Sequence, residues 1–217
     1  MKQYDYILFD LDGTITDPAL GITNAVMHAL EKYNIPVPER SELYKFIGPP
    51  LADSFMKYYG MTQPQAMKAI EYYREHFRDI GIFENTVYDG FEELMKRLCD
   101  AGKTLIVATS KPEEFAKRIT EHFGLAEYCS HVCGSNMDGT RCKKDEVVAY
   151  ALKTAGVTDV SRAVMVGDRE YDITGAAALG LDSIGVLYGY GSREELEAAG
   201  ATYIAPEVAD LFPILVG

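Results

Sequence analysis

Two aspartates, Asp10 and Asp12, end the apolar run in "ILFDLDGTITD", which spans residues 7–17. Carboxylates this close repel each other and raise each other's pKa unless a cation lies nearby. A carboxylate can act as a nucleophile or carry a proton to and from a reacting group, so the pair is a candidate for chemistry. The motif alone also fits an Asx-capped turn before Gly13, and residues elsewhere have to decide between the two interpretations.

Polar residues also follow later apolar runs. Thr109 and Ser110 end "KTLIVATS" (103–110), and Asp168 and Asp172 lie in "GDREYD", at the end of the run 162–168. A lysine pair opens the helical pattern "KKDEVVAYALKTAG" (143–156), after the run 127–134. Ligands of an open parallel sheet bind beyond the carboxyl ends of its strands, so we expect these side chains to converge.

Together these residues have the chemistry for phosphoryl transfer. The carboxylates need a cation, and Mg²⁺ is the natural one because it is hard and prefers oxygen ligands. Thr109 can donate a hydrogen bond to a phosphoryl oxygen, and Ser110 adds a backbone N–H near a helix N-terminus. A lysine supplies a compact positive charge. Positioning and charge neutralisation do most of the catalytic work in such reactions.

The sequence leaves open which lysine faces this site. Lys144 shares a helix face with Val147, Val148 and Ala151, and this spacing favours Lys144 over Lys143. Lys111 stands at the start of another helical pattern, and we expect it to project into solvent.

Five short apolar runs predict the strands that would position these residues. They cover residues 4–10, 103–110, 127–134, 162–168 and 181–189. Several are nearly continuous in apolar residues, as in parallel strands covered on both faces. Helical patterns lie between them, and this alternation predicts an α/β fold with a doubly wound, Rossmann-like parallel sheet.

The segment 16–85 breaks the alternation. It contains helical patterns and proline-rich turns, and we find no convincing strand in it. We therefore predict a catalytic core from residues 1–15 and 86–217, with a helical cap at 16–85 inserted after the first strand.

Composition limits the partners. The chain has 217 residues, 47% of them hydrophobic, and a formal net charge of −12. The acidic balance argues against binding to nucleic acid or to an anionic membrane surface. No segment resembles a signal peptide or a membrane span, and four cysteines are too few for a disulfide scaffold, so we expect a reducing cytoplasm. The spacing of Cys129, His131 and Cys133 indicates one face of a strand more simply than a metal site.

The motifs "FDLDGT", "VATSKP", the lysine before "DEVVAYAL" and "GDREYD" occur in the order seen in the haloacid dehalogenase-like hydrolase superfamily. The chain most resembles the phosphoglycolate phosphatase-like branch, which has a helical cap after the first motif. The resemblance covers nearly the whole chain. It implies that Asp10 is the nucleophile that forms an aspartyl-phosphate. It also implies that Asp12 protonates the leaving oxygen and then deprotonates the attacking water.

The resemblance further implies the binding roles. Thr109 and the Ser110 amide would hold the phosphoryl group, and Lys144 would neutralise it together with the nucleophile. Mg²⁺ would bind Asp10, the main-chain carbonyl of Asp12, and Asp168. Asp172 would be either a further ligand or a residue that orients waters on the metal.

The expected protein is thus a cytoplasmic, Mg²⁺-dependent phosphatase, a monomer or a small homo-oligomer, acting on a small phosphorylated metabolite. Phosphoglycolate, a nucleotide and a sugar phosphate are candidate substrates. A phosphomutase of the β-phosphoglucomutase type and a protein or phosphotyrosine phosphatase are alternatives. A dehalogenase is disfavoured, because Asp12 and the "GDREYD" pair serve no purpose in that reaction. A non-catalytic binding protein is disfavoured because every catalytic position is filled.

Overall fold

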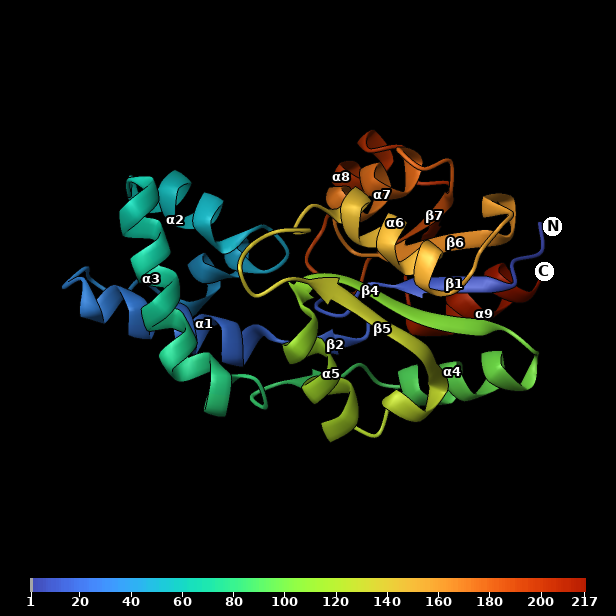
Figure 1. The fold of residues 1–217 in the computed structure, drawn as a ribbon, viewed down its shortest axis with the longest axis horizontal. Coiled ribbons are helices and arrows are strands. Elements are labelled where there is room, and N and C mark those ends of the chain that lie inside the picture. The colour runs from blue at the N-terminus through green and yellow to red at the C-terminus, as the bar shows by residue number, and fades with distance from the viewer. Residues whose placement is uncertain (1) are drawn as a thin grey trace. The chain divides into compact units, whose positions relative to one another are not determined.

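A computed structural model describes residues 2–217, and its larger unit is built around a six-stranded parallel sheet (Figure 1). The strands are β1 (Tyr6–Phe9), β4 (Thr104–Pro112), β5 (Cys129–Ser135), β6 (Ala163–Gly167), β7 (Asp182–Val186) and β8 (Tyr203–Ala205). Their order in the sheet is β5-β4-β1-β6-β7-β8, and all five pairings are parallel.

Helices cover both faces of this sheet. They are α4 (Phe91–Asp100), α5 (Glu113–His122), α6 (Lys144–Thr154), α7 (Glu170–Ala177), α8 (Arg193–Ala198) and α9 (Val208–Val216). Figure 1 shows α6 and α7 on the face opposite α4 and α5. Successive residues of β1 point to opposite faces, so Leu8 joins the core beneath α6 and α7, whereas the Phe9 ring packs 5.3 Å from Phe91 of α4. This confirms the doubly wound α/β fold.

The connections put β1 at the switch point of the sheet. From β1 the chain passes to β4 and then β5 on one side, and afterwards to β6, β7 and β8 on the other. Loops that leave neighbouring strands in opposite directions open a crevice beyond the strands' carboxyl ends. The residues that follow β1, β4 and β6 therefore share one edge.

Each of the five apolar runs holds a strand of this sheet. The apolar pattern of the sequence did not indicate β8, which has only three residues and lies at the sheet edge. It also missed a two-stranded ribbon of β2 (Thr16–Asp17) and β3 (Thr86–Val87). Such short strands carry too few residues for a periodic pattern.

Residues 18–86 form a second compact unit, and residues 1–17 with 87–217 form the first. The second unit contains α1 (Ala19–Lys32), η1 (Arg40–Phe46), α2 (Leu51–Tyr59), α3 (Gln63–His76) and η2 (Phe77–Gly81). The apolar stripes of α1 and α3 are buried, and the two helices pack on each other. That this helical unit acts as a cap stays a prediction.

Within residues 2–217, no helix has the length and apolar character needed to cross a bilayer. The four cysteines are free thiols, and Cys133 is buried in the core beneath α6. The cytoplasmic location stays a prediction.

Candidate active site

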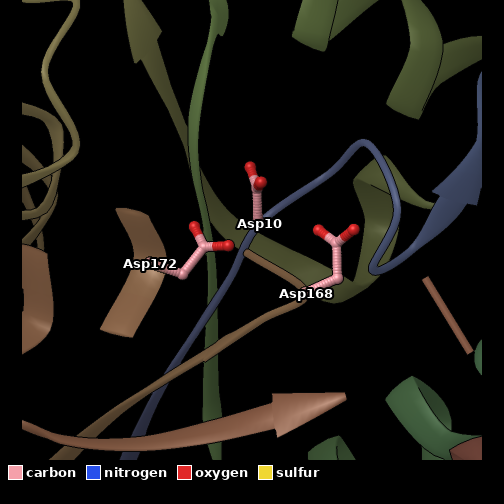
Figure 2. A group of neighbouring side chains, drawn as sticks. All are labelled: Asp10, Asp168 and Asp172. Carbon is pink, nitrogen blue, oxygen red and sulfur yellow. The ribbon is translucent and has the colours of Figure 1, made fainter. Parts of the chain in front are cut away.

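Three carboxylates from separate segments meet at the carboxyl edge of the sheet. Asp10 follows β1, Asp168 follows β6, and Asp172 lies in the first turn of α7. Ligand oxygens of the three lie within 4.8 Å of one another, and Figure 2 shows the side chains gathered there. The sheet fixes this arrangement, because the Asp10 N–H donates to the Val166 carbonyl of the neighbouring strand at 2.9 Å.

Burial makes this carboxylate group costly to ionise. All three side chains are buried. Burial, and then the charges of Asp172 and Asp10, hold the pKa of Asp168 well above its usual range. Burial likewise raises the pKa of Asp172 to about 6. A cation beside Asp168 and Asp172 would favour their charged forms.

The oxygen atoms of the group fit a hard divalent cation. Asp168 Oδ1 is buried and accepts no hydrogen bond from residues 2–217. A buried carboxylate oxygen that lacks a donor is costly unless it coordinates a metal or accepts from a ligand. Oxygen ligands on two or three carboxylates suit Mg²⁺, which keeps part of its water shell.

Lys144 places a positive charge in the same group. Its Nζ lies 3.0 Å from Asp10 Oδ1 and 2.6 Å from Asp172 Oδ1, and it donates to the Ala108 carbonyl at 3.2 Å. Burial by itself would lower the pKa of Lys144, but the carboxylates of Asp10 and Asp172 outweigh it and raise this pKa above its usual value. Lys143, the other candidate, is exposed at the N-cap of α6.

Asp12 is paired with a second buried lysine. Lys111 Nζ lies 2.5 Å from Asp12 Oδ2, and the Lys111 side chain is only 5% exposed. The expectation that Lys111 projects into solvent is therefore wrong. It failed because β4 does not stop at Ser110 but continues to Pro112, which keeps residue 111 within the sheet. Burial raises the pKa of Asp12 above its usual range, although the Lys111 ammonium opposes the rise.

The structure places the predicted phosphate-binding residues at the end of β4, next to β1 in the sheet. Thr109 is buried and Ser110 is half-buried. The Thr109 hydroxyl accepts the Lys111 N–H at 3.3 Å, which leaves its own proton free to be donated to a ligand. The roles of both residues in binding phosphate stay predictions.

The apolar run 181–189 predicted a strand as far as Gly189, but β7 ends at Val186, and residues 187–191 ("LYGYG") form a loop that holds this site together. The Tyr190 N–H donates to Asp168 Oδ2 at 2.8 Å, and the Tyr188 hydroxyl donates to the Thr14 carbonyl at 3.1 Å. Gly13 has φ +82°, and a Cβ atom there would lie 2.2 Å from Asp168 Oδ2. The packing of Asp168 against the first motif thus requires glycine at residue 13. The alternating tyrosines and glycines directly after a strand were the available signal.

Comparison with known proteins agrees with this fold. A family model of the haloacid dehalogenase-like hydrolases matches residues 7–186. A 5'-nucleotidase of Pseudomonas aeruginosa is 44% identical over 213 residues, which cover 98% of this chain and 96% of that protein. The tyrosine-protein kinase PtkA of Mycobacterium tuberculosis is 38% identical, with 91% of this chain and 67% of PtkA covered. The crystal structure of a predicted phosphatase from Clostridium acetobutylicum superimposes with a TM-score of 0.95, at 50% identity and 98% coverage of each chain.

A doubly wound sheet with acidic residues at its switch point is an arrangement typical of α/β enzymes. The chain belongs to the haloacid dehalogenase-like hydrolases. This confirms the resemblance drawn from its motifs. It is an enzyme of the hydrolase class, and its similarity to a 5'-nucleotidase and to a predicted phosphatase supports the expected phosphoric monoester hydrolase.

Proposed function

We propose that this protein is a Mg²⁺-dependent phosphatase that hydrolyses small phosphate monoesters through an aspartyl-phosphate on Asp10. The proposal rests on the carboxylate oxygens of Asp10, Asp168 and Asp172, which lie within 4.8 Å of one another. Lys144 forms ion pairs with Asp10 and Asp172. A group of buried carboxylates and one ammonium suits a reaction in which negative charge moves onto and off phosphorus.

Asp10 attacks phosphorus through a carboxylate oxygen in the first half of the reaction. Lys144 lies against Asp10 and offsets negative charge on both the nucleophile and the phosphoryl group. The Thr109 hydroxyl and the Ser110 N–H orient the phosphoryl oxygens at the carboxyl end of β4. Asp12 gives a proton to the leaving oxygen, and in the second half it takes one from the water that cleaves the aspartyl-phosphate.

Asp10, Asp168 and the main-chain carbonyl of Asp12 would hold Mg²⁺, with Asp172 as a further ligand or as a partner of its waters. The bound ion would neutralise the carboxylates and polarise the phosphoryl oxygens. The loop 187–191 keeps Asp168 in place for this, because the Tyr190 N–H occupies its Oδ2 and leaves Oδ1 available.

The substrate class that we propose to test first is the nucleoside 5'-monophosphates. The support for it is the similarity to a 5'-nucleotidase along nearly the whole chain. The helical unit, residues 18–86, would select among substrates as a cap that excludes water during the reaction.

The experiment is a screen of phosphate monoesters with Mg²⁺, ranked by kcat/KM. It includes nucleotides, phosphoglycolate, sugar phosphates and a phosphotyrosine peptide. We expect phosphate release that stops with excess EDTA and returns with added Mg²⁺. Isomerisation of a sugar phosphate without phosphate release would favour the phosphomutase alternative, and full activity in EDTA would contradict the role of the metal.

A further inference from the structure

The ion pair between Lys111 and Asp12 is a feature that the proposed mechanism does not use. The two side chains are 5% and 13% exposed. Lysine is strongly hydrated and is almost never buried unless it is paired. A surface charge therefore does not account for Lys111.

The backbone around Lys111 departs from regular strand geometry. Ala108 pairs with Cys133 and Pro112 pairs with Ser135, so four residue steps along β4 face two along β5. A bulge of this kind re-aims the side chains within it and is common next to active sites. The irregular segment contains both the phosphate-binding residues and Lys111.

Gly134 of β5 makes room for that segment. A Cβ atom at residue 134 would lie 2.6 Å from the Lys111 carbonyl oxygen and 2.7 Å from the Glu113 Cα atom. Any other residue would push the backbone that carries Lys111 away from β5. The position of Lys111 is thus built into two neighbouring strands.

We propose that Lys111 is a positioning residue that holds Asp12 by Oδ2 and leaves Oδ1 as the oxygen that exchanges the proton. An ammonium group has three donors and no acceptor, so Oδ2 has to accept from it. A proton carried by Asp12 then sits on Oδ1, which is buried and accepts no hydrogen bond from any residue that the structure describes. The inference rests on the proposed function, because it assigns an atom to the proton donor of that reaction.

This assignment fixes where each proton goes. As Asp10 forms its bond to phosphorus, the bond to the leaving oxygen breaks and that oxygen takes the proton from Asp12 Oδ1. In the second half, water returns a proton to Oδ1 while its oxygen bonds to phosphorus and the aspartyl-phosphate bond breaks. Lys111 stays protonated throughout. Its contribution is orientation, since a carboxyl that rotates freely presents the wrong oxygen part of the time.

The competing explanation is that Lys111 binds the phosphoryl group directly. A charge that binds the phosphoryl group helps every ester alike. A residue that acts through the proton donor matters most when the leaving oxygen needs a proton. The leaving group therefore separates the two explanations.

The test compares kcat/KM of Lys111→Met and wild type on substituted phenyl phosphates in Mg²⁺, from p-nitrophenyl to unsubstituted phenyl phosphate. We expect a loss of about 100-fold for phenyl phosphate and of less than about 3-fold for p-nitrophenyl phosphate, because nitrophenolate leaves without a proton. The control Lys153→Met, which removes an exposed lysine of α6, should keep kcat/KM for every ester. An equal loss along the series, or no loss, would overturn the assignment.

A double variant completes the test even if Lys111→Met does not fold, as can happen when a buried carboxylate loses its partner. Lys111→Met with Asp12→Asn removes both charges. If Lys111 acts only through Asp12, the double variant should match Asp12→Asn within about 3-fold for phenyl phosphate. If the double variant instead loses kcat/KM by the product of the two single-variant losses, Lys111 has a role independent of Asp12, and the inference is refuted. A wild-type enzyme that hydrolyses no phosphate ester would refute the proposed function and the inference with it. An active wild-type enzyme, together with variants whose dependence on the leaving group is unaltered, would refute the inference alone.

Discussion

The active-site ion pairs of the α/β core differ sharply in burial from a lysine–glutamate pair of the helical unit. In the core, Lys144 and Lys111 have side chains at most 5% exposed and pair with carboxylates at most 13% exposed. In the helical unit, the Lys68–Glu71 pair lies on the surface with its side chains 51% and 64% exposed. The same residue types therefore interact strongly in the buried active-site pairs and only weakly in this exposed pair.

The difference in burial between the two kinds of ion pair indicates which charged residues have a role beyond stability. A buried pair costs desolvation that its own attraction does not always repay, so its presence favours a role other than stability. An exposed pair is screened by water and salt and can be lost at little cost. The core charges are thus the ones to alter in order to test function.

Asp10→Asn should have a larger effect on activity than any other single substitution in either unit. It removes the proposed nucleophile and a proposed metal ligand while nearly preserving side-chain shape. We expect kcat/KM for any phosphate ester to fall by roughly 10⁴-fold or more, as loss of a nucleophile does elsewhere. Thermal unfolding of the variant should show an intact fold, and substantial retained turnover would contradict the assignment.

Lys144→Met should mainly reduce stability in the metal-free protein. It leaves Asp10 and Asp172 buried without their shared ammonium partner, and breaking a buried pair costs about 3–5 kcal/mol. Urea denaturation without Mg²⁺ measures the loss. Adding Asp172→Asn should recover part of it, and a double variant no more stable than the single one would count against the pairing.

The pH dependence of stability should reveal the acidic cluster. The pKa of Asp168 is raised in the folded state, and that of Asp172 is raised to about 6. A raised carboxyl pKa means that the folded protein binds the proton more tightly than the unfolded chain. The stability that this tighter proton binding contributes is fully present below about pH 4, the pKa of an aspartate in the unfolded chain. It is lost as the pH rises through the pKa of the carboxyl in the folded protein.

The metal-free wild type should therefore lose Tm between about pH 4 and a pH above 6. Asp168→Asn removes one of the buried acids, so its Tm should fall less over this range and should exceed that of the wild type at neutral pH. Mg²⁺ should raise the neutral-pH Tm of the wild type but not of the variant. Identical pH profiles with and without Asp168 would show that the carboxylates do not interact as described.

Lys68→Met should have the smallest effect. Its exposed pair with Glu71 in α3 gives little net stability, because water screens it and two long side chains lose freedom to form it. We expect no measurable change in Tm and no change in kcat/KM for p-nitrophenyl phosphate. A Tm loss as large as that of Lys144→Met would remove the distinction between the two units.

Much of the fold and the site was predictable from the sequence. Apolar runs located five of the six strands of the sheet, because strands covered on both faces have to be apolar along their length. Because parallel strands end at one edge, Asp10 and Asp168 were expected at the same edge of the sheet, and the strand order, which places β6 beside β1, brings them together. Helical spacing also favoured Lys144, which the structure places against Asp10.

Only the tertiary structure decided the place of Lys111 and of the loop 187–191. Local sequence made Lys111 the start of a helix, but pairing with β5 extends β4 through an irregular segment and buries its side chain. The hydrogen bond from the Tyr190 N–H to Asp168 joins residues 22 positions apart in sequence through backbone geometry. The sequence by itself determined which chemistry was present and at which strand ends, because apolar and polar periodicity is a local property. Which oxygen or ammonium meets which partner depends on contacts between distant segments, and those exist only in the folded protein.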